Sequence, residues 1–176
     1  MTKRSGKKRT PAPSPRTAAI PIAAPARARL IRRVRRGDLD AIIALDTRTT
    51  GLSKDAHWRE LVERGCRSRR ENEFVFLVAV SDDDSTPLTG FIVGEVRAWE
   101  FGSAPCGWVY AMAVDPSVRE QRVGEHLLAA VAAEFRRSGV RKMRTMVAKE
   151  NRLPMLFFRG EGMMAGPYIQ LEKDLE

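Results

Sequence analysis

Cysteine is scarce in this chain, with only Cys66 and Cys106 among 176 residues. Two isolated cysteines are too few for a disulfide framework and lack the spacing of a zinc site, so we expect a reducing, cytoplasmic location. Long apolar runs are also missing, since no stretch approaches the ~20 residues that a membrane-spanning helix needs. Proline and arginine interrupt residues 21–29, which excludes the apolar core of a secretory signal there. We therefore expect no membrane association.

Acidic residues are absent from the first 36 positions, which contain 12 of the 31 lysines and arginines. The formal net charge of +9 belongs to this segment, because the remaining 140 residues contain 19 basic and 22 acidic side chains. Residues 1–28 add Pro, Ala and Ser but few large apolar side chains. Such a segment cannot bury enough apolar surface to offset its ordering entropy. We predict a disordered basic arm over residues 1–28 and one folded domain over residues 29–176.

The arm also suggests a class of function. Positive charges over residues 3–36 could hold an anionic surface such as nucleic acid, with an affinity that falls as salt rises. No aromatic side chain is interleaved there to stack on bases, which argues against specific single-strand recognition. The alternative is a solubilising tail without a partner.

Hydrophobic patterns beyond the arm predict a mixed domain. We predict strands at about residues 30–34, 74–80, 88–99, 107–114, 143–148 and 168–171. We predict helices that start at Gly37-Asp38, after a cap at Ser53, at Arg122 and at Leu153, and that Gly65 ends the second one. This order favours an α/β (mixed α+β) fold with a largely antiparallel sheet and one parallel step.

Three consecutive aspartates at positions 82–84 raise the question of calcium. An EF-hand loop that starts at Asp82 needs glycine at its sixth position and glutamate at its twelfth, where this chain has Pro87 and Val93. We therefore interpret residues 81–87 as a hairpin turn and predict no metal site.

Residues 108–128 carry the clearest chemical signal. A buried strand runs into a short polar turn and then into the first turn of a helix. Free backbone N–H groups and the positive end of the helix dipole meet there, which suits an anion such as a pyrophosphate. Arg119 and Arg122 add positive charge, and Gly124 lets a ligand approach the backbone closely. The alternative is an ordinary strand-to-helix turn without a ligand.

This segment resembles the signature of the GNAT superfamily of acyl-CoA-dependent N-acetyltransferases, in which an R/Q-x-x-G-x-G/A turn follows a V-x-P strand end. Val114 and Pro116 match the strand end, Arg119 matches the first position of the turn and Gly124 its last. Arg122 stands where the family has its first glycine, and its guanidinium could contact phosphate instead.

A second segment, residues 151–163, resembles the family's N-x-x-A-x-x-x-Y-x-x-x-G-F. Asn151 and Gly162 match, whereas Pro154, Phe158 and Met163 replace the alanine, the tyrosine and the phenylalanine. Two family segments in the right order and at the right separation make the resemblance specific over about residues 108–171.

The resemblance implies a GNAT-like central twisted sheet, mostly antiparallel, with a splayed parallel strand pair and flanking helices. It implies acetyl-CoA (coenzyme A) as co-substrate without a metal, an amine acceptor on a small molecule or a protein, and a homodimer as a common family assembly. The cofactor-binding positions that it implies are Met112, Ala113, Val114, Arg119, Gln121, Arg122, Val123, Gly124, Glu125, Asn151 and Phe158.

The general base is not fixed by these motifs. An amine with a pKa near ~10.4 is protonated at neutral pH, so a base would be useful. Tyr110, two residues before Met112, and Glu95 on the preceding strand are the catalytic candidates. The alternatives are a core tyrosine with a bonded hydroxyl and a solvated strand glutamate. Phe158 has no titratable proton, which keeps open a coenzyme-A-binding module with little catalysis.

The acceptor is expected between the first two helices, residues 38–70, and the segment 160–171. Four carboxylates of the helical region could attract an amine: Asp38, Asp46, Asp55 and Glu63.

Overall fold

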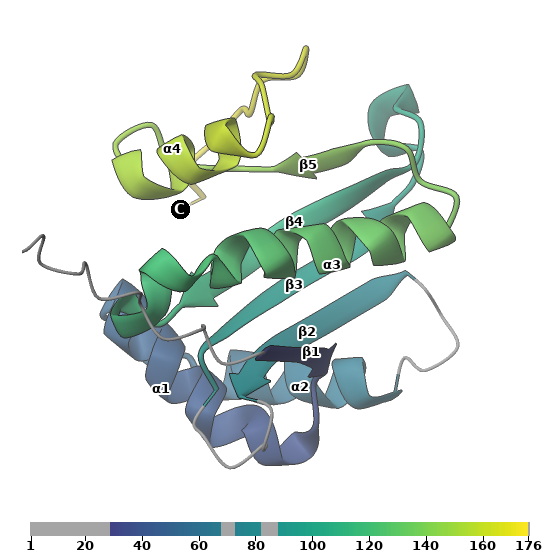
Figure 1. The fold of residues 1–176 in the computed structure, drawn as a ribbon. Coiled ribbons are helices and arrows are strands. Elements are labelled where there is room, and N and C mark those ends of the chain that lie inside the picture. The colour runs from purple at the N-terminus through teal and green to yellow at the C-terminus, as the bar shows by residue number, and fades with distance from the viewer. Residues whose placement is uncertain (1–28, 68–72, 82–87, 176) are drawn as a thin grey trace, which may run out of the picture.

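The computed structural model describes residues 29–67, 73–81 and 88–175. The predictions for the arm, residues 1–28, and for the turn at residues 82–87 lie outside these ranges. The described chain forms one sheet with helices on both faces (Figure 1), which confirms the predicted mixed α/β fold. Within the described ranges, each helix is too short or too polar to cross a bilayer.

The sheet has five strands in chain order, and its last pair is parallel. Strands β1 (Arg29–Arg33), β2 (Phe74–Ser81), β3 (Gly90–Arg97) and β4 (Cys106–Val114) form an antiparallel meander, and β5 (Met143–Thr145) runs parallel to β4. Strands β2 and β3 are rich in Val, Phe and Ile because helices cover both faces of the sheet.

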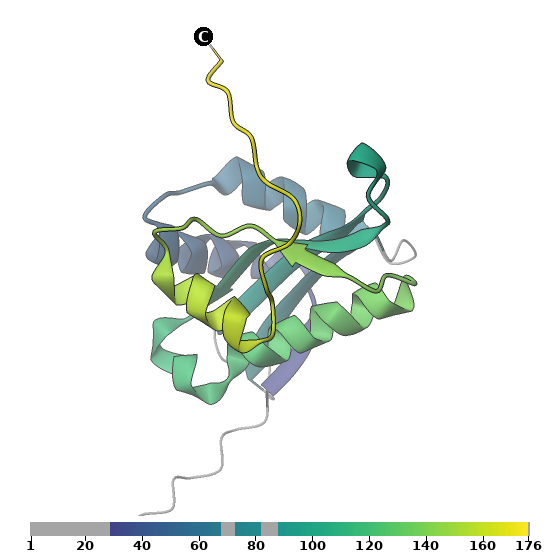
Figure 2. The same cartoon turned by 90° about the horizontal axis from the view of Figure 1, so that it is seen from above.

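Four α-helices flank the sheet. Helices α1 (Leu39–Thr50) and α2 (Asp55–Arg67) cover one face, and α3 (Val123–Arg137) covers the other, so that the sheet lies between them in the view from above (Figure 2). Helix α4 (Arg152–Gly160) lies beyond β5. Three short 3₁₀ helices complete the described elements: η1 (Arg36–Asp38), η2 (Glu100–Gly102) and η3 (Pro116–Gln121).

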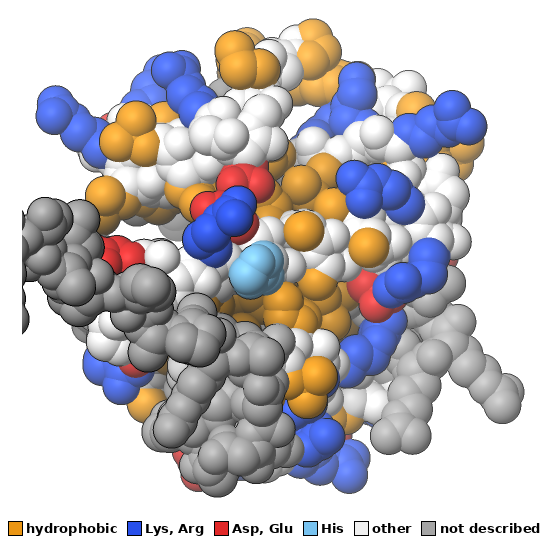
Figure 3. All heavy atoms as spheres, viewed as in Figure 1, with side chains coloured by type: hydrophobic (Ala, Val, Ile, Leu, Met, Phe, Trp, Pro, Cys, Tyr) orange, Lys and Arg blue, Asp and Glu red, His pale blue; other side chains and the backbone are white. Residues whose placement is uncertain are grey.

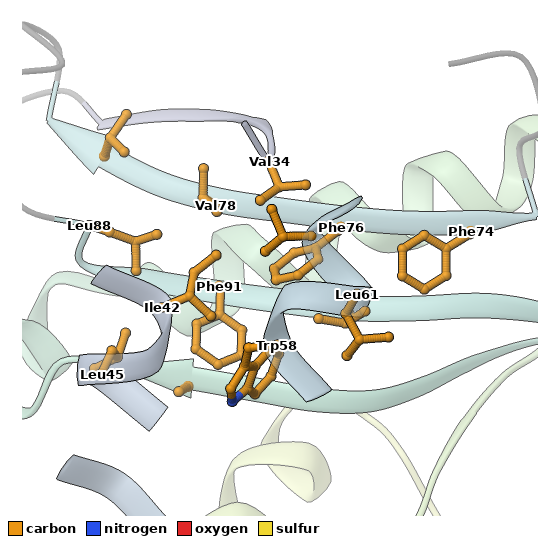
Figure 4. Packing of buried hydrophobic residues seen from close by; sticks show 14 residues of the cluster. Val34, Ile42, Leu45, Trp58, Leu61, Phe74, Phe76, Val78, Leu88 and Phe91 are labelled. Carbon is orange, nitrogen blue, oxygen red and sulfur yellow. The ribbon is translucent and has the colours of Figure 1, made fainter. Parts of the chain in front are cut away.

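Aromatic side chains hold α1 and α2 to the sheet. Trp58 of α2 lies edge-on to Phe91 of β3, with ring centroids 4.9 Å apart, and Phe76 of β2 completes the group (Figure 4). The indole Nε1 of Trp58 donates to the buried Asp46 carboxylate at 2.8 Å, and Lys54 Nζ pairs with the same oxygen. This satisfies the polar edge of a buried tryptophan and joins α1 to α2.

The opposite face is packed by α3. Leu127, Val131 and Phe135 fall on one stripe of this helix and are buried against the sheet. A Cβ atom at Gly107 of β4 would lie 2.2 Å from the Phe135 ring, so only glycine lets this ring rest on the strand. The close contact fixes the end of α3 against β4.

The predicted ends of the second helix and of the fifth strand are wrong. Gly65 does not end the second helix, which continues to Arg67; the glycine is needed because a Cβ atom there would lie 2.6 Å from Val34 Cγ1. Strand β5 ends at Thr145, not at Ala148.

Residues 168–171 form no strand, although their apolar pattern predicts one. Ile169 and Leu171 are 83% and 84% exposed, since the segment crosses β5 rather than running along it (Figure 2). It contacts the strand through the Tyr168 ring, which stacks on the Arg144 guanidinium at 4.5 Å.

Candidate active site

Strand β4 contains a β-bulge at Tyr110. In the pairing with β3, Val93 lies opposite Ala111 and Gly94 opposite Val109, so Tyr110 has no partner. An extra residue in one strand turns consecutive side chains to the same face. Accordingly, Tyr110 and Ala111 both pack against the core under α1 and α2.

The bulge places the catalytic candidate Tyr110 and the cofactor-binding candidate Met112 on opposite faces of the sheet. Ala113 also faces α1 and α2, whereas Met112 and Val114 pack on the α3 side. Without the bulge, Tyr110 would share the face of Met112 because side chains alternate with period two. Tyr110 therefore lies on the side where an acceptor is expected, away from the α3 side.

Strands β4 and β5 separate at Val109, the residue just before the bulged Tyr110. Their pairing covers three residue pairs and ends at Val109 and Thr145, where the Thr145 hydroxyl donates to the Val109 carbonyl at 2.8 Å. Strand β4 continues to Val114, and no described strand pairs with this part of its outer edge. The backbone of residues 110–114 is therefore able to receive an extended ligand as an additional strand.

The turn after β4 leads directly into the first turn of α3. Asp115 begins it by accepting a hydrogen bond from the Ser117 backbone N–H at 2.9 Å. Helix η3 contains the backbone of Arg119 and ends at the exposed Gln121. Arg122 then takes a left-handed φ of 57° before Val123 starts α3. A glycine adopts this conformation without strain, which explains the glycine in the family pattern at this position.

Glu125 lies in the first turn of α3 and pairs with Arg122. Arg122 Nε donates to Glu125 Oε2 at 2.6 Å. This hydrogen bond holds the pKa of the Glu125 carboxyl below its usual range and raises the pKa of the Arg122 guanidinium. The carboxylate occupies the positive end of the helix dipole, where an incoming phosphate would compete with it.

Gly124 lies at the junction of α3, β4 and α4. A Cβ atom there would lie 3.0 Å from Met112 Cε and 3.1 Å from Phe157 Cε2. A larger residue at this position would therefore displace the Met112 side chain or the Phe157 ring. Val123 beside it is buried in the core under α3.

The second predicted segment forms α4 and its start. Asn151 precedes the helix, is exposed, and makes no capping hydrogen bond with its side chain, so its amide can contact a ligand. Phe158 is buried against α3 and lies edge-on to Phe157 at 5.1 Å. Phe158 therefore supplies apolar wall and no proton.

Tyr110 has a buried hydroxyl without a hydrogen-bond partner among the described residues. Burial, followed by the negative charge of Glu95, raises the pKa of this phenol well above its ordinary value. A general base near neutral pH needs a shift in the opposite direction. The environment thus keeps Tyr110 protonated and argues against a role as base.

Glu95 lies between two arginines on the same face. Its carboxylate is 3.0 Å from Arg64 Nη1 and 3.1 Å from Arg97 Nε, and its side chain is 20% exposed. The Arg97 guanidinium also stacks on the Trp108 ring at 4.7 Å. Glu95 is therefore a member of an ion-pair network rather than the solvated residue of the alternative interpretation.

The carboxylates expected to attract an amine are largely engaged by the chain itself. Asp38 pairs with Arg32 at 2.8 Å, Glu63 pairs with Arg36 at 2.8 Å, and Asp46 is bound by Lys54. Asp55 accepts a hydrogen bond from Ser53. Three of these four carboxylates are therefore compensated by a basic side chain of the chain itself.

Three features of this site escape sequence reasoning. The bulge at Tyr110 and the Thr145 hydroxyl depend on the register between strands, and neither leaves a residue pattern in the chain. Arg144 of β5 is the other omission. A basic residue one position before the end of a strand carries no special signal until the strand is placed beside Trp108.

The fold and this strand-to-helix site define an acyltransferase architecture. A family model described as the acetyltransferase (GNAT) family matches residues 39–159. The chain belongs to the GNAT acetyltransferase family, as the resemblance predicts.

Solved structures share the fold at low sequence identity. The aminoglycoside N-acetyltransferase AAC(6')-Iy in complex with CoA has a TM-score of 0.70 and 19% identity over 89% of this chain and 99% of that one. AAC(6')-Ih from Acinetobacter baumannii has a TM-score of 0.68 and 15% identity over 85% and 100%. Glucosamine-6-phosphate N-acetyltransferase from Arabidopsis thaliana has a TM-score of 0.64 and 18% identity over 85% and 99%. Comparison with curated proteins gives no match.

Proposed function

We propose that this protein transfers an acetyl group from acetyl-CoA to a primary amine by direct attack in a ternary complex. The observation that carries the proposal is the separation of β4 from β5 after the Val109–Thr145 pair, which leaves a free strand edge beside the start of α3. Membership of the GNAT acetyltransferase family supports the same chemistry.

The free edge and the turn fit the two ends of the donor. The backbone of Met112, Ala113 and Val114 would pair with an extended pantetheine arm, as an added strand does. The turn from Gln121 to Glu125, with Arg119 and Arg122, would hold the pyrophosphate at the helix N-terminus. Asn151 would contact the arm from the start of α4, and Phe158 would form part of the wall.

Acetyl-CoA supplies an activated thioester whose thiol leaves as a stable thiolate. The amine forms the new C–N bond, the C–S bond breaks, and the amine proton passes to solvent. A backbone N–H of β4 beyond the bulge would stabilise the oxyanion. The departing thiol has a pKa of about 8.5, so it needs no acid, which is compatible with Phe158.

Neither catalytic candidate has the surroundings of a strong base. We propose that Tyr110 acts as an uncharged hydrogen-bonding group toward the acceptor, since its hydroxyl is buried and unpartnered among the described residues. We propose that Glu95 orients Arg64 and Arg97. The nucleophile would then be the small neutral fraction of the free amine, roughly one molecule in a few thousand at pH 7 for a pKa near 10.4.

Calorimetric titration of acetyl-CoA into the protein tests the donor site. Saturable binding by the wild type, lost in Gly124→Trp and retained in Arg59→Gln on the exposed side of α2, supports the proposal. Acetylation is then measured by mass spectrometry with a panel of amines. A folded wild type that binds no acetyl-CoA would overturn the proposal.

A coenzyme-A-binding module with little catalysis is the second candidate function. The observation that favours it is the buried Phe158, together with the raised pKa of Tyr110. Tight acetyl-CoA binding without transfer to any amine would select this function.

The basic arm supports a third candidate, nucleic-acid association through residues 3–36. In the described part of this stretch, Arg32, Arg33 and Arg36 pair with carboxylates of the domain. Basic side chains on the face shown in Figure 3 are scattered among apolar and acidic ones. Deleting residues 1–28 tests the arm directly, and a homodimer and a cytoplasmic location stay predictions.

A further inference from the structure

Arg144 of β5 carries a part-buried guanidinium that has no carboxylate partner among the described residues. Its Nη1 atom lies 3.4 Å from Ser103 Oγ and 3.5 Å from Cys106 Sγ, and the Tyr168 ring covers it at 4.5 Å. None of these three described neighbours carries a negative charge to compensate the guanidinium. The planar fork of an arginine matches a carboxylate or a phosphate with two parallel hydrogen bonds.

The position of Arg144 connects it to the acceptor side of the site. It lies beside Trp108 in the parallel register, one residue before the Val109–Thr145 pair at which the strands separate. Residues opposite each other in adjacent strands point to the same face, so Arg144 shares the Trp108 side, under α2. Strand spacing and rise place its Cα about 8 Å from that of Tyr110.

The charges around this place are predominantly positive. Arg64 and Arg97 share the single carboxylate of Glu95, and Glu100 approaches Arg97 at 3.9 Å. Arg144 adds a third guanidinium on the same side of the sheet. Two carboxylates therefore face three guanidinium groups, which attracts an anion and repels a cation.

We infer that the acceptor is a primary amine that also carries an anionic group, a phosphate or a carboxylate, and that Arg144 binds this group. The inference rests on the proposed acetyltransferase function and specifies its substrate class. Because the guanidinium extends from the separating strands toward Ser103, the anion should lie roughly 10 Å from the amine. Amino-sugar phosphates and amino acids with a side-chain amine approach that span, and polycationic amines should be disfavoured.

Matched acceptor pairs test this specificity. Glucosamine 6-phosphate is compared with glucosamine, and lysine with 1,5-diaminopentane, which lacks the carboxylate. We expect kcat/KM to favour the anionic member of at least one pair by about tenfold or more, and Arg144→Gln to remove that preference. The pair that shows the preference identifies phosphate or carboxylate. Arg59→Gln on α2 is the matched control and should leave the preference intact.

A structural role alone would give a different result. If Arg144 only anchors the segment around Tyr168, Arg144→Gln lowers kcat/KM equally for both members of each pair. Tyr168→Leu removes the ring but keeps the guanidinium, so it should preserve the preference for the anionic acceptor. Equal kcat/KM values in the wild type for acceptors with and without the anionic group would overturn the inference.

A binding measurement separates this inference from the proposed function. Inorganic phosphate is titrated into the protein at saturating CoA while the Arg144 Nε–Hε signal, assigned by its loss in Arg144→Gln, is followed by NMR. A saturable shift of that signal supports the anion site even if every amine in the panel fails, in which case the transferase proposal alone is lost. The same titration with acetate probes a carboxylate, and no shift of the Arg144 signal with either anion would overturn the anion site.

Discussion

Thr145 donates its hydroxyl to the Val109 carbonyl at the last pair of residues that join β4 to β5. The bond ends the parallel ladder at one fixed residue, because the next residue of β4 is the bulged Tyr110. The free edge proposed to receive the pantetheine arm begins at this point. Its location therefore depends on a side chain of β5 as well as on the sequence of β4.

Replacing this hydroxyl tests how much the edge depends on it. Thr145→Val keeps the shape of the side chain but leaves the Val109 carbonyl unpaired, and should lower the free energy of unfolding by about 1 kcal/mol. It should also weaken acetyl-CoA binding, because the two strands no longer separate at a fixed residue. Thermal unfolding and calorimetric titration measure the two effects. Thr49→Val in α1, which loses a hydrogen bond within its helix, should reduce stability alone.

Arg122 combines a left-handed backbone with a charged side chain. Arg122→Gly should be more stable than Arg122→Ala by about 1 kcal/mol, since glycine takes a positive φ without a steric cost. Both variants should bind acetyl-CoA more weakly than the wild type and by a similar factor, because both lose the guanidinium. Denaturant unfolding and calorimetry check the two statements. Wild-type affinity in both variants would show that Arg122 makes no phosphate contact.

Glu125 competes with an incoming phosphate for Arg122 and for the start of α3. Glu125→Gln should raise the affinity for acetyl-CoA severalfold at low salt, and the gain should shrink as salt screens the charge. Because its pKa is lowered, the Glu125 carboxylate is charged at neutral pH. It is protonated only when pH falls through this lowered pKa. The Arg122–Glu125 pair therefore contributes to stability at neutral pH and is lost in acid. Titrations at two salt concentrations measure the effect on affinity, and Glu60→Gln on α2 is the control.

Tyr110 should remain un-ionised at pH values where an ordinary phenol ionises, near 10. The chain has two tyrosines, so Tyr168→Phe leaves Tyr110 as the only phenol. Phenolate absorbance in this variant should appear above the ordinary pKa. A raised pKa stabilises the fold below the unfolded value and loses that contribution as pH rises toward the folded value. Ordinary titration in the folded protein would contradict the buried, unpartnered hydroxyl.

Glu95→Gln distinguishes an ion-pair role from a base. The variant leaves Arg64 and Arg97 beside a neutral amide, so unfolding should become easier by about 1–2 kcal/mol, reduced from a fully buried pair by partial exposure. The pH profile of kcat/KM should keep its shape and continue to rise toward the pKa of the acceptor amine. A loss of roughly 10²-fold or more with a changed profile would instead identify Glu95 as the base.

The sequence predicts this fold correctly where the hydrophobic periodicity is clear and where glycine or capping residues mark a turn. The helix predicted to start at Arg122 forms as α3, and the glycine-bearing turn lies where the motif predicts. The misplacements have physical causes. Gly65 is read as a helix stop, yet it is a contact point with Val34, and the apolar pattern at residues 168–171 does not show whether a partner strand is adjacent.

The site divides in the same way. The turn follows from a local motif, because helix dipoles and glycine geometry are local properties. The free edge depends instead on where β5 leaves β4, which only the fold determines. The orientation of Tyr110 and the engagement of Glu95 by two arginines arise from segments that are distant in the chain. The same holds for Arg144, which has no carboxylate partner in the part of the chain that the structure describes. Tyr110 and Met112 are two residues apart and still face opposite ways, which no alternation rule anticipates.

The bulge at Tyr110 also allows the two faces of β4 to be engineered separately. The side chains of residues 110 and 111 pack on the α1 and α2 side of the sheet, whereas those of residues 112 and 114 pack on the α3 side. A library that randomises the first pair should evolve new acceptor preferences without rewriting the donor site. The extra residue thus gives one strand two independently adjustable sides.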